Sequence, residues 1–545
     1  MDSMNWRSRA EPVGVPAVDD SAAIERNPEL GNVPDAVRQF IVFFRAKFRE
    51  GNTQEIHTLY ENTFNKLSKK YYPDSEWPPA EVIAPLVEND EPFLLLYKEL
   101  YFRHVHGTPL VSLAHRLDAW QNYGDLFDFF LTGGMRQFDL PPSWLWDLTD
   151  EFIYQFEAWC QYRSKPKNKT EEEIQYLEEN DYIWNVNGVL GYLHNLVHHS
   201  NIISWLLNGN APAGSSDPRD NNFDVSSLPV YRYIGYFSII GLLRLHCLLQ
   251  DYRLALLVLQ PLDFDITTPL YTHVSACNVS LFYYMGFAYM MLRRYDDAIR
   301  VFSSTLMHIG RIKQYHTRSY QFEQINKRND QMVALLSICF AFSPQHTEES
   351  KFGILREKYS DKLNRMLGGD ESVFEELFTY ASPKFVSPAP PDYQLQLIAS
   401  AESSASIGPD PAKLQLAIFM REVKQQALLP HIRSYLRLYR SINVPKLASF
   451  MDVDDATCRA NLLSLKHKSW ELVGNAFEPP VAGTFQSRSG VHFHINSDNV
   501  VQIQDSEVEI KYGHYFIEQM EHLDAVVATQ RLKLLASASK KAVHE

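Results

Sequence analysis

Hydrophobic side chains recur along the first half of this chain at the three- and four-residue intervals of amphipathic helices. A clear example begins at Val37, with Phe40, Ile41 and Phe44 on the same face. The same periodicity covers residues 55–67, 93–104, 113–131 and 144–162. Alternation of apolar and polar residues, the pattern of a half-buried strand, is nearly absent there. We therefore predict a helical domain over residues 34–230.

The middle of the chain contains a more specific helical pattern. Large, small and aromatic residues follow the offsets of the tetratricopeptide repeat, which is a pair of packed helices. The matching positions are Phe282, Met285, Gly286, Tyr289, Ala298 and Phe302. Gly286 and Ala298 would let the two helices approach closely, and a related string at 250–256 precedes them at an irregular spacing. We therefore predict an irregular helical-repeat (tetratricopeptide-like) solenoid over residues 231–381, which would present an extended surface to partners.

The pattern changes twice after the predicted solenoid. Residues 382–411 are rich in proline and serine, which predicts a long loop. Residues 412–511 then predict helices at 428–442, 444–450 and 454–470, followed by strands at 491–495 and 500–503. Three helices followed by a small sheet are typical of a winged helix. The predicted fold class is mainly α: a solenoid, then a winged helix, then a C-terminal helix.

The C-terminal helix, predicted within residues 512–545, has a narrow apolar seam. Its positions recur at alternating spacings of four and three, the pattern that drives knobs-into-holes packing between helices. The seam consists of Phe516, Met520, Leu523, Val527, Gln530 and Leu534. Gln530, its one polar residue, would restrict the register of a helix bundle. We predict that this helix bundles with helices of partner proteins; packing against its own winged helix is the alternative.

Composition limits the cellular setting. Hydrophobic residues make up 45% of the 545 positions, which is enough for several cores. Residues 1–33 lack apolar periodicity, so they predict a flexible arm, and they lack the apolar segment of a secretory signal. The five cysteines are dispersed, which indicates a reducing compartment. Because no apolar run approaches membrane-spanning length, we expect a soluble protein without a membrane partner.

The net charge of −14 disfavours a protein that binds nucleic acid by bulk phosphate neutralisation. Any RNA contact would therefore be a local patch, and Lys466, His467 and Lys468 form one candidate. Cations that stabilise a helix C-terminus are the alternative interpretation of these three residues. Asp454 and Asp455 begin the same predicted helix and would face phosphates in a major groove, so specific DNA recognition is not expected.

Histidine spacing is the main candidate for a metal site. His194, His198 and His199 place imidazoles one helical turn apart, but the glutamate of an H-E-x-x-H site is missing. His492 and His494 would share one strand face, which is too few ligands to define a zinc site. We predict no metal and no cofactor. A metal hydrolase that uses the His194 cluster is an alternative function, which metal analysis of the purified protein would test.

Other patterns that resemble catalytic or binding motifs have structural interpretations. Gly133-Gly134 lacks the lysine of a phosphate-binding loop and predicts a turn. Asp452, Asp454 and Asp455 could be paired catalytic carboxylates, but helix capping is the favoured interpretation because no nucleophile accompanies them. A second basic patch, predicted to be a solvated loop, contains Arg163, Lys165, Lys167 and Lys169. No catalytic residue is predicted.

Several longer strings resemble a known family. They are Tyr236–His246, Tyr283–Tyr289, Arg293–Phe302, Leu355–Tyr359, Ser382–Phe385, Val444–Ala448 and Phe485–Ser487. These strings are similar to the L-subunit family of eukaryotic translation initiation factor three. The order of solenoid, winged helix and terminal helix is similar to the PCI domain of proteasome-lid, signalosome and initiation-factor subunits. The resemblance starts near Pro34 and departs in the N-terminal arm and in the loops 208–228 and 399–413.

This resemblance implies a non-catalytic scaffold subunit that supports assembly of the initiation complex on the small ribosomal subunit and messenger RNA. The implied partners are the other subunits of the factor, especially the K subunit and other PCI subunits. It also favours the bundle for the C-terminal helix, since PCI proteins join their terminal helices in this way. A PCI subunit of the proteasome lid or the signalosome is the alternative, and co-purifying partners would distinguish the two.

Overall fold

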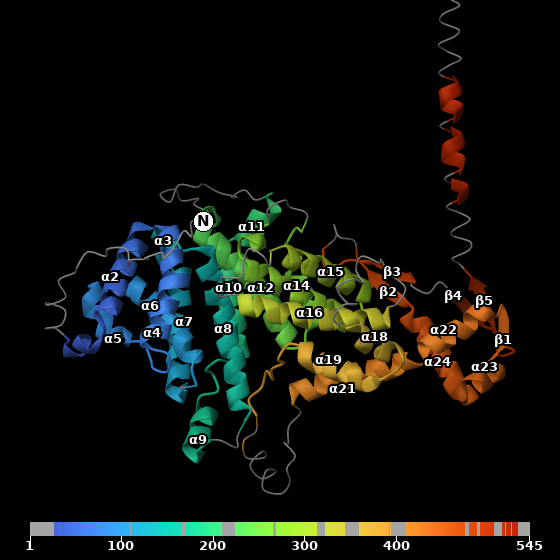
Figure 1. Cartoon of the computed structure of the whole chain (residues 1–545), viewed down its shortest axis with the longest axis horizontal. Coiled ribbons are helices and arrows are strands. Elements are labelled where there is room, and N and C mark those ends of the chain that lie inside the picture. The colour runs from blue at the N-terminus through green and yellow to red at the C-terminus, as the bar shows by residue number, and fades with distance from the viewer. Residues whose placement is uncertain are drawn as a thin grey trace, which may run out of the picture. The chain divides into compact units, whose positions relative to one another are not determined.

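The chain is mainly helical, with small antiparallel sheets toward its C-terminal end (Figure 1). A computed structural model describes residues 27–109, 111–165, 169–209, 224–264, 269–312, 322–343, 359–391, 393, 410–474, 479–487, 491–505, 515–517, 519–524 and 526–531. The chain forms two compact units. The first comprises residues 1–367, 375–417 and 474–482, and the second comprises residues 368–374, 418–473 and 483–545.

The first unit begins with a series of helices of very different lengths. They are α2 (Asp35–Glu50), α3 (Thr53–Thr58), α4 (Asn65–Tyr71), α5 (Ala80–Ile83), α6 (Glu91–His106), α7 (Leu113–Leu131), α8 (Pro142–Arg163), α9 (Glu171–Glu179), α10 (Val186–His199) and α11 (Ile202–Leu207). Polar side chains begin several of them, as Asp90 does for α6, Ser112 for α7 and Thr170 for α9. The helices predicted at 93–104, 113–131 and 144–162 are confirmed to within two residues.

Two details of this region differ from the predicted pattern. The helix predicted at 55–67 is divided by a π-helical segment, Leu59–Phe64, which directs Tyr60 toward Trp144 and Phe64 toward Trp77. The predicted arm of residues 1–33 also ends in structure, because Pro28–Asn32 forms a 3₁₀ helix. Its fully buried Leu30 explains why this short segment is ordered. Residues 1–26 lie outside the described part of the chain.

A second series of helices follows. They are α12 (Pro229–Leu248), α13 (Tyr252–Val258), α14 (Ser275–Met291), α15 (Tyr295–Ile312), α16 (Phe322–Phe342), α18 (Ser360–Leu367), α19 (Glu371–Ala381) and α21 (Pro411–Ala427). Helix α12 packs against α8, α10 and α14, and α15 packs against both α14 and α16. The predicted close approach at Gly286 is present: a Cβ atom there would lie 2.5 Å from the Phe302 ring. Only glycine therefore fits this contact without displacement of the ring.

Residues 474–482 belong to the first unit although they are distant from it in sequence. Arg294, which is 4% exposed, donates hydrogen bonds to the carbonyl oxygens of Pro480 (2.6 Å) and Ala482 (3.0 Å). Asp297 pairs with Arg294 and accepts a hydrogen bond from the amide of Gly474. This buried ion pair fixes the segment against the start of α15. No pattern in the sequence indicates this contact.

The second unit contains helices α22 (Leu429–Leu438), α23 (Val444–Met451) and α24 (Asp455–Lys468) and two small sheets. The strands are β1 (Ser441–Asn443), β2 (Trp470–Val473), β3 (Thr484–Ser487), β4 (Val491–Ile495) and β5 (Val500–Asp505). One antiparallel sheet has the order β1-β5-β4, and the other pairs β2 with β3. Ile432, Leu447, Leu462 and Val501 lie at the centre of a core built from all three helices and the larger sheet.

The predicted strands at 491–495 and 500–503 are confirmed, but the helix predicted at 428–442 extends too far. The chain leaves α22 at Leu438, and Ile442 pairs with Val501 as part of strand β1. Pairing with β5 supplies backbone hydrogen bonds that a longer helix end would lack. Strands β1, β2 and β3 were absent from the prediction because three- and four-residue strands carry too little alternation to detect.

Candidate functional sites

The predicted C-terminal assembly helix is helical wherever the structure describes it, at residues 515–517, 519–524 and 526–531. Phe516 is 62% exposed, Met520 64%, Leu523 60% and Val527 48%. Gln530 is also exposed. Leu534, the last predicted seam position, lies outside the described residues. The described apolar members of the seam are therefore about half exposed or more. The bundle with partner helices stays a prediction.

The basic patch at the end of α24 is largely engaged in contacts within the second unit. The Lys468 side chain is 10% exposed, and its Nζ lies 2.6 Å from Glu422 Oε1. Lys466 Nζ donates a hydrogen bond to the carbonyl oxygen of Phe493 at 3.2 Å and lies over the Phe493 ring. His467 is exposed. Two of the three candidate RNA contacts therefore already have protein partners.

The histidines of α10 do not converge on one point. His194 and His198 are exposed, whereas His199 packs toward the ring of Tyr231, and burial lowers the pKa of His199. His492 and His494 share one face of β4, opposite the buried Val491 and Phe493. Among the residues that the structure describes, no three His, Cys, Asp or Glu side chains form a group that could hold a metal ion.

One of the three acids around the start of α24, Asp454, caps the helix as predicted. Asp454 accepts a hydrogen bond from the amide of Thr457, and hydrogen bonding by the side chain and the amide of Thr457 lowers the pKa of Asp454. Asp452 has a left-handed conformation at the end of α23, and Asp455 lies in the first turn of α24. At the start of α9, Thr170 and Glu173 form a capping box.

The glycine pair and the second basic patch have structural roles. Gly133 adopts a φ of 83°, which confirms the predicted turn, and Gly134 begins a 3₁₀ helix. Arg163 corrects the prediction of a solvated loop, because it is 4% exposed and donates to the carbonyl oxygen of Ser387 at 3.1 Å. Lys169 donates to the carbonyl oxygen of Tyr162, and burial lowers the pKa of Lys169 to about 8. Lys165 is exposed, and Lys167 lies outside the described residues.

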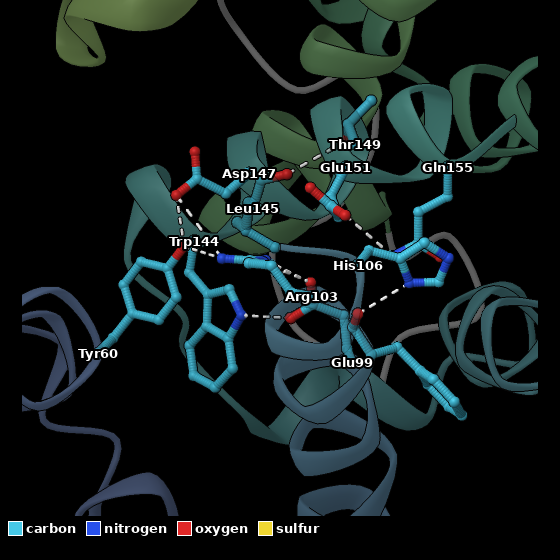
Figure 2. Close-up of polar contacts among 11 residues, drawn as sticks. Tyr60, Glu99, Arg103, His106, Trp144, Leu145, Asp147, Thr149, Glu151 and Gln155 are labelled. Atoms are coloured by element: carbon cyan, nitrogen blue, oxygen red, sulfur yellow. Dashed lines mark hydrogen bonds and ion pairs between the residues drawn. The ribbon is translucent and has the colours of Figure 1, made fainter. Parts of the chain in front are cut away.

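A buried polar cluster, absent from the sequence analysis, lies between α6 and α8 (Figure 2). Glu99 is fully buried and accepts hydrogen bonds from Arg103 Nε at 3.0 Å and from Trp144 Nε1 at 3.1 Å. Arg103 also donates to the Tyr60 hydroxyl, which in turn donates to Asp147. The cluster ties the π-helical segment, α6 and α8 together through one cation and two carboxylates.

Glu151, on the next turn of α8, is the unusual member of this region (Figure 2). It accepts a hydrogen bond from Gln155 Nε2 at 3.0 Å, and burial raises the pKa of its carboxyl to about 7. The positive charge of Arg103 opposes this shift, while the nearby Glu99 and Asp150 add to it. The hydrogen bonds of the neighbouring cluster join α6 to α8 and the π-helical segment, which is a structural role.

Comparison with known proteins shows similarity over most of the chain. A family model described as RNA polymerase I-associated factor PAF67 matches residues 115–523. Eukaryotic translation initiation factor 3 subunit L of Nematostella vectensis is 44% identical over 495 residues, covering 90% of this chain and 92% of its own length. The Homo sapiens protein of the same name is 43% identical over 523 residues, covering 91% of this chain and 90% of its own.

The chain belongs to the family of eukaryotic translation initiation factor 3 subunit L. The resemblance found in the sequence strings is thereby confirmed, and the lid and signalosome alternatives are set aside. Membership in this family of initiation-factor subunits also confirms the expectation of a non-catalytic protein. In the described part of the chain, no helix is both long and apolar enough to cross a membrane.

Substitution of Glu151 is expected to change how stability depends on pH. Because its pKa is near 7 in the folded chain and about 4.5 when unfolded, the folded chain binds the proton more tightly. This contribution to stability is present below about pH 4.5 and is lost as pH rises through about 7. Glu151→Gln keeps the acceptor for Gln155 and cannot ionise, so it should be more stable than the wild type at pH 8 and similar at pH 4.5.

Urea unfolding at several pH values would measure this difference. Partial solvent access to Glu151 makes about 3 kcal/mol an upper limit for it. Glu172→Gln, an exposed position on α9, is the control and should change little. A Glu151→Gln curve parallel to that of the wild type from pH 4.5 to 8 would show that Glu151 titrates normally.

Proposed function

We propose that this chain is a scaffold subunit of eukaryotic translation initiation factor 3 that supports assembly of the initiation complex on the small ribosomal subunit and messenger RNA, in the cytoplasm. The observation that carries the proposal is similarity to subunit L proteins over about nine tenths of the chain. The aligned region also covers about nine tenths of each relative's own length. The proposal assigns binding, and no chemistry, to this chain.

The proposed architecture is a helical-repeat solenoid, a winged helix and a terminal helix, with the bounds predicted from the sequence. The close α14–α15 contact at Gly286 supports a repeat-like unit. In the second unit, helices α22, α23 and α24 share one core with the β1-β5-β4 sheet, which supports a winged helix. A solenoid exposes a long surface, and a winged helix adds a compact module, as expected of a scaffold.

The proposed partners are the K subunit and the other PCI subunits of the factor. The seam from Phe516 to Val527 supports this assignment, since four apolar side chains at heptad-like spacing are each about half exposed or more. Apolar area of this kind is stabilised by burial against another helix. The described seam has no such partner within this chain.

Affinity purification of the tagged full-length chain tests the proposal. The expected result is co-purification of the other initiation factor 3 subunits, including K, together with small ribosomal subunits. A high-salt wash should remove ribosomal subunits before it removes protein partners that are held by apolar contacts. Recovery of proteasome-lid or signalosome subunits instead would overturn the assignment.

Direct RNA contact by the α24 patch remains a separate proposal. Lys466→Glu combined with Lys468→Glu should weaken RNA crosslinking without loss of the other subunits, since phosphate contacts depend on local positive charge. Because Lys468 pairs with Glu422, the double variant is compared with Lys468→Met, which removes the same ion pair without reversing charge. Equal crosslinking by the wild type and the double variant would leave these lysines as structural helix-end cations.

A further inference from the structure

The first unit contains a pocket that no part of the proposed function uses. Its volume is about 210 Å³, and it is lined by one face of α8, by α12, α14 and α16, and by residues 382–384. Trp146, Asp150, Tyr154 and Glu157 follow one another along α8 at helical spacing, so the same face of this helix is directed into the pocket. Trp146 and the buried Tyr284 of α14 form apolar walls.

The carboxylates of the pocket already have cationic partners. Arg244 of α12 lies 2.5 Å from Asp150 Oδ1 and 3.3 Å from Glu157 Oε2. Lys384 Nζ lies 3.7 Å from the other oxygen of Glu157. These four side chains are therefore balanced in charge, and Arg244 retains an Nε–H without a hydrogen-bond partner among the described residues.

Two further cations of the pocket, Arg328 and Lys327, have no carboxylate partner among the residues that the structure describes. Arg328 donates to Gln331 Oε1 at 3.0 Å and to the Tyr284 hydroxyl at 3.1 Å, and its guanidinium lies 4.3 Å from the centroid of the Tyr283 ring. These neutral contacts hold the guanidinium in one orientation and leave three of its five N–H groups. Lys327 is exposed.

We infer that this pocket binds a carboxylate side chain from an acidic peptide segment of a partner protein. A fixed guanidinium with spare donors matches a carboxylate in charge and geometry, and the Trp146 and Tyr284 walls suit the methylene groups of a glutamate. A nucleic-acid strand is disfavoured because Trp146 and Tyr284 are too buried to stack with a base. This binding site is separate from the seam of the terminal helix, and the inference holds whether or not that helix binds partner subunits.

Binding of defined peptides to the full-length chain tests this inference. The probe is a blocked hexapeptide with two central glutamates and an uncharged dye, followed by fluorescence polarisation. The matched probe carries glutamines instead, and a phosphoserine peptide and an oligouridine complete the set. The glutamate peptide should bind and the glutamine peptide should not. Arg328→Gln should weaken binding roughly tenfold, and Lys327→Gln by about threefold, since an exposed ion pair contributes less.

Lys69→Gln is the control, because it removes an equal charge from an exposed position on α4 that does not line the pocket. Lys327→Gln keeps the test valid if loss of Arg328 prevents folding, which thermal unfolding would show. Equal binding of the glutamate and glutamine peptides, no binding of either, or equal weakening by Lys69→Gln would overturn the inference. Tighter binding of the phosphoserine peptide or the oligouridine than of the glutamate peptide would overturn the assignment to a carboxylate.

Discussion

Truncation of the chain after Lys511 should give a soluble, folded protein that no longer co-purifies with the other initiation factor subunits. The truncation removes the whole seam, whose described apolar members are 48% to 64% exposed in the isolated chain. It removes none of the buried side chains that form the core of the second unit. The last of these in the sequence is Val501. Stability should therefore change little while assembly is lost.

The magnitude of this effect should be large because several apolar side chains act together. Burial of one large apolar side chain contributes about 1.5–3 kcal/mol, so loss of four would weaken a bundle by several orders of magnitude. Quantification of the subunits that co-purify with the tagged chain measures the outcome. If the truncated chain still enters the complex at wild-type stoichiometry, another surface of the chain must bind the other subunits.

A matched pair of substitutions separates the seam from the helix itself. Met520→Ser with Leu523→Ser places two polar residues in the seam, whereas Glu521→Ser with His522→Ser places them at exposed positions outside it. Both variants reduce helix propensity, so a difference between them reports the seam alone. The first variant should lose most of the co-purifying subunits and the second should retain them.

The terminal helix was predictable because its periodicity extends over several turns. Phe516, Met520, Leu523 and Val527 keep alternating spacings of four and three residues, and each is about half exposed or more. The helices of the first unit were predictable for the same reason. A three-residue strand such as β1 is too short to show alternation. In the sequence, Ile442 fits the apolar pattern of the preceding helix, and only its pairing with Val501 shows that it belongs to a strand.

The contacts that could not be predicted join residues far apart in sequence. Nothing near Arg294 indicates that its guanidinium will bind Pro480 and Ala482. Likewise, Arg103 has the appearance of an ordinary helix residue until the fold brings Tyr60 and Asp147 to it. Polar residues of this kind satisfy buried partners that the tertiary structure alone defines. Periodicity identifies which face is apolar, and it does not identify which charged residue will be buried.

Substitution of Gly286 by leucine should destabilise the first unit, because the α14–α15 contact leaves no room for a side chain. A Cβ atom at Gly286 would meet three atoms of the Phe302 ring at 2.5–2.9 Å, and Phe302 is fully buried. Overpacking of this kind costs about 1–3 kcal/mol and should lower the midpoint of thermal unfolding of the full-length chain.

Gly191→Leu on α10 is the matched control, since a Cβ atom there has nothing within 4 Å. Both substitutions gain up to about 1 kcal/mol of helix propensity, so the control should be neutral or stabilised and the difference isolates the clash. Phe302→Leu should lower the midpoint by itself, but combined with Gly286→Leu it should cost less than the sum of the two changes, because the smaller side chain makes room. Additive losses, or an unchanged midpoint for Gly286→Leu, would show that the ring moves aside without cost and that close helix approach at Gly286 is not required.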